Sequence, residues 1–405
     1  MYCVRQVTDQ LYWVGANDRR LPLFENIHPI PRGISYNSYL LLDEAAVLFD
    51  TVDWSACRQL MENLEHLLDG RALDYVVIHH MEPDHGASLQ AVLDRWPGVK
   101  LVATAMAFRF LDQFGVSSAG HERITVKDGD TRSFGKHTVT FLTAPMVHWP
   151  EVMVSFDQTT GALFSADAFG TFGALNGRLF NDEMDFDRDW LDEARRYYAN
   201  IVGKYGDATQ TLLKKAAALG DELKLICPLH GPVWRSDLRY FLDKYDKWSR
   251  YEPEEKGVAV IYGSMYGNTE QAADALAAAL VERGLTQVSL WDVSSTHVSH
   301  LISEVFRLSH VVLASVTYNM GIYPPTLDLL EDMRALNVQN RTFAVLENGT
   351  WAPKSGELMG KFVTEELAGC TLLEPKLTLK SSLPAARAGE LEALADTIAA
   401  SVKGE

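Results

Sequence analysis

Cysteine is scarce in this sequence, and the few cysteines are far apart. The chain has 405 residues and four cysteines, with no C-x-x-C pair among Cys3, Cys57, Cys227 and Cys370. This spacing disfavours a disulfide framework, a zinc ribbon and a cysteine-ligated iron–sulfur cluster. Cys227 stands three residues before His230, but we interpret it as a buried reduced thiol and not as a metal ligand. The cysteine pattern therefore predicts a protein of a reducing cytoplasm.

Positive charge and long apolar runs are also scarce. Lys and Arg number 37 against 54 Asp and Glu, which gives a formal net charge of −17. So acidic a chain is a poor partner for nucleic acid or for an anionic membrane surface. No uncharged apolar run approaches the roughly 18 residues of a membrane-spanning helix. Residues 1–6 contain no apolar signal core. We therefore expect no nucleic acid, no membrane and no secretory signal.

The sequence changes texture near residue 250. The chain is longer than a single domain with one hydrophobic core usually is, so we predict two domains. Residues 1–250 carry many short β-like runs with interspersed helical stretches, which predicts sheets with helices on their outer faces. A polar linker with a proline follows at 251–256, and strands then alternate strictly with helices over 257–405. That alternation predicts an open, doubly wound parallel sheet, so the whole chain is of the α/β class.

Individual elements can be predicted in both regions from their apolar patterns. In the first region we expect a helix at 54–68 and strands at 11–14, 38–42, 46–49, 99–102 and 138–141. In the second region we expect helices at 270–283 and 386–402 and strands at 258–262, 287–291, 310–314 and 342–346.

The most informative segment follows the apolar run 75–78. Residues 79–86 read His-His-Met-Glu-Pro-Asp-His-Gly and bring three imidazoles and two carboxylates to the end of a predicted strand. Crowding such groups costs desolvation and repulsion between carboxylates, so a structural role alone does not explain it. One or two multivalent cations would explain it. Strand alternation points His79 to the opposite face from His80, and we expect His79 to make a structural hydrogen bond.

Further ligand types stand at the ends of other apolar runs: His148 after 141–147, Asp167 after 162–166 and His230 after 225–229. Strand ends on one side of a sheet can converge in space although they are far apart in the sequence. Hard carboxylate oxygens, added to imidazoles, favour iron or manganese over zinc. The sequence therefore predicts a metal centre at a shared edge of strands.

The order H-x-E-x-D-H, then a distant His, a distant Asp and a final His, resembles the ligand order of the metallo-β-lactamase fold. Most zinc hydrolases of that fold carry His at the position of Glu82, whereas the form with Glu is similar to the flavodiiron proteins (A-type flavoproteins). The resemblance implies an N-terminal αββα sandwich that holds two non-haem irons with a bridging oxo, hydroxo or water ligand. It assigns one iron to His80, Glu82, His148 and Asp167, and the other to Asp84, His85, Asp167 and His230. These residues would be both metal ligands and catalytic residues, and in that family the ligand matching His85 is sometimes unbound.

A second constellation lies between the first predicted strand and the first predicted helix of the region 257–405. Residues 262–270 are rich in small and hydroxyl side chains, so their backbone N–H groups could wrap a phosphate at a helix N-terminus. The loop lacks lysine, which excludes a Walker A motif, and it is not a G-x-G-x-x-G fingerprint. Plain N-capping is the alternative. The loop resembles the phosphate loop of flavodoxins, which bind flavin mononucleotide (FMN). That implies contacts from Ser264, Met265, Tyr266, Gly267, Asn268 and Thr269.

Two more loops of this region, 317–321 and 347–352, follow predicted strands. Ligands of doubly wound sheets bind at such carboxyl ends of strands. Tyr318 and Trp351 could stack on the isoalloxazine ring, although packing within the loops is the alternative. The residues expected to meet the flavin here are Thr317, Tyr318, Asn319, Gly321, Asn348, Gly349, Thr350 and Trp351.

A metal pair joined to a flavodoxin-like domain predicts an iron site that is reduced through flavin and then reduces a small diatomic molecule. The resemblance to flavodiiron proteins covers essentially the whole chain and implies reduction of O2 to water or of NO to N2O. Reduction of O2 to two waters consumes four electrons, which matches two from the irons and two from the flavin, whereas reduction of two NO to N2O needs only two. We favour O2 slightly, with NO as a second activity. The chain ends at Glu405 without a rubredoxin-like module, so we expect a separate donor such as rubredoxin. The resemblance also implies a head-to-tail homodimer or a dimer of dimers.

Two other interpretations are open. The main one is a dizinc hydrolase of the glyoxalase or lactonase type fused to a flavodoxin domain, and the other is an electron carrier with a decayed metal site. Glu82 argues against the first, and the complete ligand set argues against the second. Around the metals, Tyr197 or Tyr198 could donate a proton or a hydrogen bond, and Phe24 and Trp149 could form pocket walls.

Overall fold

The computed structural model describes residues 1–404, which form two compact units. The first unit comprises Met1–Tyr198 and Asp207–Asp246, and the second comprises Ala199–Gly206 and the chain from Lys247 onward. The final change of unit, after Asp246, lies close to the expected linker. The domain bounds given above remain a prediction.

The first unit contains two main sheets. The larger sheet has its strands in the order β1 (Arg5–Gln6), β2 (Leu11–Trp13), β7 (Tyr39–Leu42), β8 (Ala46–Phe49), β9 (Tyr75–Val77), β10 (Lys100–Ala103) and β11 (Arg123–Thr125). The smaller sheet has the order β12 (Thr131–Ser133), β13 (Thr138–Thr143), β14 (Met153–Asp157), β15 (Ala162–Phe164) and β16 (Leu225–Cys227). Two short pairs join β3 (Ala16–Asp18) to β6 (Ile34–Tyr36) and β4 (Leu23–Phe24) to β5 (His28–Pro29).

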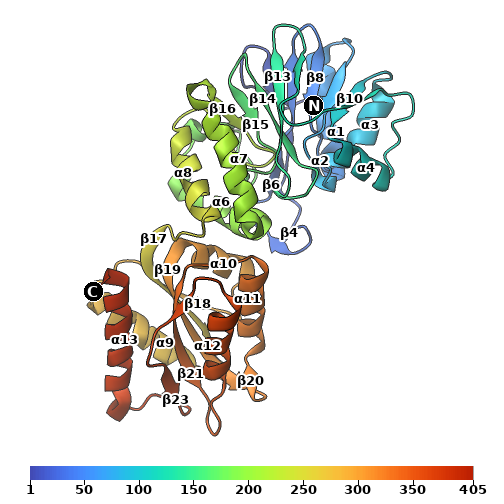
Figure 1. The fold of residues 1–405 in the computed structure, drawn as a ribbon. Helices are drawn as coiled ribbons and strands as arrows, with labels where there is room; N and C mark the ends of the chain where they lie inside the picture. The colour runs from blue at the N-terminus through green and yellow to red at the C-terminus, as the bar shows by residue number, and fades with distance from the viewer. Residues whose placement is uncertain (405) are drawn as a thin grey trace. The chain divides into compact units, whose positions relative to one another are not determined.

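Helices flank these sheets on their outer sides (Figure 1). Beside the larger sheet lie α1 (Cys57–Leu68), α3 (Leu89–Arg95) and α4 (Ala105–Gln113). Beside the smaller sheet lie α6 (Leu191–Tyr197), α7 (Gly206–Ala218) and α8 (Leu238–Ser249). Strands β8, β14, β15 and β16 are buried along their whole length, as expected when both faces of a sheet are covered. The predicted sandwich and the strands and helix predicted for this region are confirmed.

The second unit is an open sheet of mainly parallel strands. Its main path runs β18 (Val288–Asp292), β17 (Glu255–Gly263), β19 (Leu308–Tyr318), β21 (Thr342–Asn348) and β22 (Thr371–Leu372). Strand β23 (Leu377–Leu379) continues beside β21, and the short β20 (Gly321–Ile322) pairs antiparallel with β19. Counted along the chain, this is the 2-1-3-4-5 strand order of flavodoxin-like folds.

Helices cover both faces of this second sheet (Figure 1). On one face, α9 (Asn268–Glu282) and α13 (Ala388–Lys403) close a core that includes Val260, Leu276 and Ile398. On the other face lie α10 (Val298–Arg307), α11 (Pro324–Ala335) and α12 (Ser355–Glu366). The predicted doubly wound sheet is therefore confirmed, with its strands and its first and last helices within a few residues of the expected positions.

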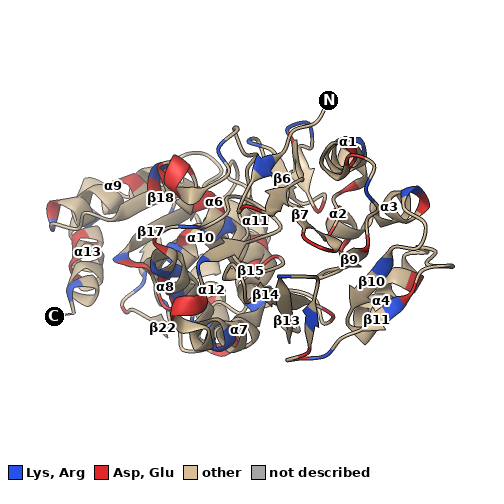
Figure 2. Ribbon diagram, turned by 90° about the horizontal axis from the view of Figure 1, so that it is seen from above, with Lys and Arg blue, Asp and Glu red and all other residues tan. Residues whose placement is uncertain are grey.

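Charged residues occur mainly in helices and loops, whereas the central strands carry few of them (Figure 2). Among residues 1–404, none of the helices combines the length and the apolarity that a bilayer crossing requires.

Candidate functional site

Four segments that follow strands of the first unit carry the expected metal ligands. Helix α2 (Pro83–Gly86) comes shortly after β9, with Glu82 as its N-cap residue and Pro83 at its first position. Proline suits that position because the first N–H of a helix has no partner within the helix. His148, Asp167 and His230 follow β13, β15 and β16, which run in the same direction. Their ends therefore meet at one edge of the smaller sheet, as the sequence predicted.

The first cluster consists of His80, Glu82, His148 and Asp167, whose ligand atoms all lie within 4.8 Å of one another. The Nε2 atom of His80 lies 3.2 Å from Glu82 Oε2 and 3.3 Å from Asp167 Oδ2. The Nε2 atom of His148 lies 3.0 Å from the same Glu82 oxygen and 3.2 Å from the same Asp167 oxygen. Two imidazole nitrogens and two carboxylate oxygens thus converge on one point.

The second cluster consists of Asp84, His85 and His230, and it also takes in Asp167. Asp84 Oδ2 lies 3.3 Å from His85 Nε2 and 3.1 Å from His230 Nε2. The other oxygen of Asp167, Oδ1, lies 3.1 Å from His85 Nε2 and 3.6 Å from His230 Nε2. Asp167 therefore offers one oxygen to each cluster.

The donor atoms of these clusters fit metal ions well. Asp84 Oδ1 and Oδ2, Asp167 Oδ2 and His230 Nε2 are all buried, and none has a hydrogen-bond partner among residues 1–404. Buried polar atoms without partners are costly unless something else satisfies them. Four imidazoles and three carboxylates around two adjacent points suit a pair of iron or manganese ions. The residues present therefore fit the implied diiron group.

The pKa values at the clusters reflect this density of carboxylates. Burial lowers the pKa of His148, but Asp167 and Glu82 outweigh it and raise that pKa to about 9. Burial also lowers the pKa of His85, while Asp84 and Asp167 raise it to about 9. Burial raises the pKa of Asp167, but the imidazoles of His85 and His148 hold it well below its usual range. The pocket thus favours positive charge among its carboxylates, either as protons on imidazoles or as metal cations.

Two groups behind the ligands fix the orientation of their imidazoles. His80 Nδ1 lies 2.7 Å from Glu151 Oε1, and His230 Nδ1 lies 2.7 Å from the backbone oxygen of Ser35. In each case an Nδ1–H can donate, which leaves the Nε2 lone pair directed at the cluster. Sequence reasoning missed Glu151, which is 2% exposed and also accepts the Met81 N–H. Its proximity in sequence to His148 was the only signal.

His79 points away from the clusters, as strand alternation predicted. Its Nδ1 lies 2.5 Å from Asp50 Oδ2, and its Nε2 lies 2.7 Å from Ser155 Oγ. The ring is fully buried and stacks near Phe49 and Phe164. His79 therefore has a structural hydrogen-bond role within the core.

Aromatic side chains form walls around the clusters. Phe24 and Tyr197 lie 5.4 Å and 5.5 Å from the His230 ring, and Trp149 lies 5.2 Å from the His80 ring. The hydroxyl of Tyr197 is buried without a hydrogen-bond partner among the described residues. Tyr198 instead packs its ring 4.9 Å from Tyr245. Of the two tyrosines considered, the structure brings Tyr197 to the metal ligands.

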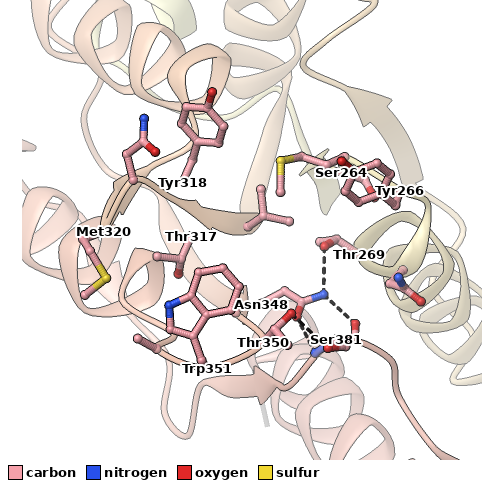
Figure 3. Close-up of a pocket in the computed structure, with 16 residues that line it drawn as sticks. Ser264, Tyr266, Thr269, Thr317, Tyr318, Met320, Asn348, Thr350, Trp351 and Ser381 are labelled. Carbon is pink, nitrogen blue, oxygen red and sulfur yellow. Dashed lines mark hydrogen bonds between the residues drawn. The ribbon is translucent and has the colours of Figure 1, made fainter.

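The second unit contains a cavity of about 450 Å³ at the carboxyl ends of its strands (Figure 3). Twelve of the fourteen residues expected to meet the flavin line it, the exceptions being Gly267 and Gly321. Gly267 instead makes the turn into α9, with a φ of 87° that favours glycine. Residues missed by the sequence analysis also line the cavity: Val316, Met320, Ala352 and Ser381.

Asn348 ties three of the loops around this cavity together (Figure 3). Its Nδ2 donates to Thr269 Oγ1 at 3.2 Å and to the Ser381 backbone oxygen at 2.8 Å. Its Oδ1 accepts from the Ser381 N–H at 3.0 Å, and Ser381 Oγ donates to Thr350 Oγ1 at 3.0 Å. Ser381 belongs to a fourth loop, after β23, which carries no motif in the sequence. The pocket is thus a set of loops joined by hydrogen bonds, and its volume lies within the range of cofactor sites.

Comparisons with known proteins agree with both halves of this picture. Residues 34–231 match the family model described as ODP family beta lactamase, and residues 260–370 match the flavodoxin model. A nitric oxide reductase from Moorella thermoacetica is 33% identical over 336 residues, which cover 83% of each chain. A rubredoxin-oxygen oxidoreductase from Megalodesulfovibrio gigas is 30% identical over 407 residues, which cover 99% of this chain and 98% of the relative.

The chain belongs to the flavodiiron protein family.

Solved structures of flavodiiron proteins superpose over the same extent. The rubredoxin oxygen:oxidoreductase from Desulfovibrio gigas gives a TM-score of 0.91 at 29% identity and covers 99% of both chains. The flavodiiron protein from Giardia intestinalis gives a TM-score of 0.91 at 25% identity and covers 99% and 98% of the two chains. The predicted two-domain α/β fold and the predicted family are confirmed. Family membership also removes the support for a fused zinc hydrolase.

Proposed function

We propose that this flavodiiron protein reduces O2 to water, and NO to N2O as a second activity, with electrons that pass from a separate donor through FMN to two irons. The observation that carries the proposal is the shared carboxylate Asp167, which faces two clusters of ligands in a chain that also holds a flavodoxin-type pocket. Relatives named nitric oxide reductase and rubredoxin-oxygen oxidoreductase support both substrates. O2 is the favoured one because its electron demand equals the capacity of both cofactors.

In this proposal one iron would be held by His80, Glu82 and His148 and the other by Asp84, His85 and His230, and Asp167 would offer an oxygen to each. When bound, the irons supply coordination positions for the diatomic molecule and half of the four electrons that O2 requires. The protein residues fix the geometry around them. Glu151 and the backbone of Ser35 hold the His80 and His230 rings so that Nε2 faces the metal position.

Tyr197 is the residue best placed to act on a bound diatomic molecule. Its hydroxyl is fully buried and has no hydrogen-bond partner among residues 1–404, and its ring packs against those of His230 and Phe172. Burial raises its pKa well above the usual value, and the carboxylates of Asp167 and Asp84 add to that rise, so the hydroxyl stays protonated. A protonated hydroxyl can donate a hydrogen bond to the oxygen atom on which negative charge develops. Phe24 and Phe172, both buried, help to exclude water from this pocket.

FMN would occupy the cavity of the second unit. Ser264, Thr269 and the N-terminus of α9 suit its phosphate, and Tyr318 and Trp351 could stack on its ring. Several rim residues are exposed: Tyr266 is 89% and Trp351 is 86% accessible to solvent. Exposed apolar side chains that gather into one patch are typical of contact sites for other proteins. We infer a head-to-tail dimer or a dimer of dimers, with rubredoxin or a similar small protein as donor.

The four free cysteines and the acidic composition suit a reducing cytoplasm. The test of the proposed function is anaerobic reduction by rubredoxin and its reductase, followed by electrode measurements of O2 and NO consumption. We expect two irons and one FMN per chain, with consumption of both gases and faster consumption of O2. Two zinc ions per chain with thioester hydrolysis and no gas consumption would contradict the proposal.

A further inference from the structure

A buried carboxylate stands beside the flavin pocket without lining it. Glu347 is 2% exposed and immediately precedes Asn348 and Gly349, which do line the pocket. Along β21, Leu346 points into the core on the α9 and α13 face, so Glu347 points to the face that α12 covers. An acidic side chain is unusual in such a place unless it has partners or a purpose.

The surroundings of Glu347 are built to hold its charge. Oε2 accepts the Gly356 N–H at 2.9 Å, while Oε1 accepts from Thr378 Oγ1 at 2.7 Å and lies 2.8 Å from Lys376 Nζ. A β-carbon on Gly356 would lie 2.8 Å from Glu347 Cδ, so a larger residue there would have to displace the carboxylate. Burial raises the pKa of Glu347, but Lys376, Thr378 and the Gly356 N–H outweigh it and lower that pKa, so the carboxylate stays ionised.

These contacts hold the third loop of the pocket at both ends. Residues 349–352 line the pocket and lie between Glu347 and Gly356 in the sequence. The hydrogen bond from the Gly356 N–H to the Glu347 carboxylate joins the two ends of this segment. Thr317 Oγ1, from the second loop, accepts the N–H groups of Lys354 and Ser355 at 2.8 Å and 3.0 Å. The first amides of α12 are therefore satisfied within the protein. Their partners position the second and third loops, whose Thr317 and Trp351 Figure 3 shows on the side of the cavity opposite Ser264 and Thr269.

The charge of Glu347 has a single close basic partner among the described residues. Lys376 has a side chain that is 37% exposed, whereas that of Glu347 is 3% exposed. Without Lys376, the carboxylate would be an uncompensated charge beside the flavin. Coulomb interactions between buried groups are screened only weakly. Adding electrons to a flavin next to such a charge would be harder.

We propose that Glu347 is a positioning residue for the third flavin loop, and that its ion pair with Lys376 sets the midpoint potential of the bound flavin. This inference rests on the proposed binding of FMN. The carboxylate fixes the loop, and the lysine cancels its charge, so that the flavin accepts electrons from the donor at an accessible potential. Charge and position can be separated, because Glu347→Gln keeps an oxygen for Gly356 while Lys376→Met keeps the lysine stem.

The test is an anaerobic spectroelectrochemical titration of the full chain loaded with FMN. Glu347→Gln should raise the ratio of reduced to oxidised flavin at a fixed potential by about threefold to tenfold, and Lys376→Met should lower it by a similar factor. A tenfold change corresponds to about 30 mV for a two-electron couple. In the double variant the ratio of reduced to oxidised flavin should return towards that of the unaltered protein. The matched control is Lys361→Met, which removes the same charge from an exposed pair with Glu365 on α12.

Shifts of the midpoint potential in opposite directions in the two single variants support the proposal. A purely structural effect would not change direction with the sign of the charge that is removed. Shifts in the same direction, no shift, or equal shifts in Lys376→Met and Lys361→Met would overturn it. If Glu347→Gln does not fold, the comparison of the two lysine variants decides alone. Failure of the unaltered protein to bind FMN would refute the proposed cofactor, which is a separate and visible outcome.

Discussion

Asp167 and His148 meet at the point where the two metal clusters join. Asp167 Oδ2 lies 3.2 Å from His148 Nε2, while the other oxygen of the same carboxylate faces the second cluster. A single side chain therefore belongs to both groups of ligands. This relationship makes Asp167 the residue on which a two-metal centre depends most.

Replacement of Asp167 by Asn should remove the bridge. An amide offers one neutral oxygen in place of two charged ones, so both irons should bind at least about 100-fold more weakly and turnover should fall by a similar factor. Iron content by mass spectrometry and gas consumption by electrode measure the two effects. Asp182→Asn, in an exposed ion pair with Arg235, is the control and should change neither. Full activity in Asp167→Asn would revive the view of a decayed metal site, and full iron content would contradict the bridging role of Asp167.

Glu151→Gln should weaken the first iron without removing a ligand. The carboxylate orients the His80 ring at 2.7 Å, and loss of such outer partners typically costs about 10-fold to 100-fold in metal affinity. Competition with a chelator at fixed pH measures the effect. Glu122→Gln, on the surface near Lys100, serves as the matched control. Unchanged chelator resistance in Glu151→Gln would show that the ring is held by other contacts.

Tyr197→Phe should slow turnover while iron and FMN stay bound. Loss of a hydrogen-bond donor at a reacting oxygen costs about 10-fold to 1,000-fold in kcat. Tyr198→Phe is the internal control, because that ring packs on Tyr245 instead of His230. Steady-state rates with O2 and with NO, measured with each variant, give the comparison. Equal losses in the two variants would assign Tyr197 to packing alone.

The second unit should lose stability in mild acid because of His310. Burial lowers the pKa of His310 from 6.5 to about 4, and Lys256 adds to that effect. The unfolded chain therefore takes up this proton first as the pH falls from about 6.5 to about 4, and the free energy of unfolding declines over that window. Above pH 6.5 the group contributes no pH dependence. Denaturant unfolding of the unaltered protein and of His310→Gln, followed across this range, should show a flatter pH dependence in the variant. Identical profiles would remove His310 as the cause.

The segments of each site whose residues are neighbours in the sequence could be predicted, because a short motif identifies each of them. His80, Glu82, Asp84 and His85 lie within one short segment after β9, and the loop 264–269 connects β17 to α9. Strand ends of known direction must meet at one edge of a sheet, so His148, Asp167 and His230 could be added to the cluster.

The remainder depends on tertiary packing. Glu151 lies 71 residues from its partner His80, and Ser381 reaches the flavin pocket through a loop without a motif. Tyr197 and Tyr198 are adjacent, identical in type and both fully buried, so the sequence does not indicate which of them faces the metal ligands. The assignment of Ala199–Gly206 to the second unit likewise has no sequence signal. Such features depend on how distant segments pack, which periodicity and spacing do not encode.

The proposed function requires that flavin electrons leave this protein through the paired metal clusters. Its most direct test is a rapid-mixing experiment in which the fully reduced chain, freed of donor, meets O2 while the flavin absorbance is followed. We expect fast flavin reoxidation with about one O2 consumed per chain, because flavin and two irons together would store the four electrons that O2 requires. In Asp167→Asn the flavin should reoxidise only at the slow rate of a simple flavodoxin. Equally fast reoxidation in both proteins would contradict the proposed route of the electrons through the metal clusters.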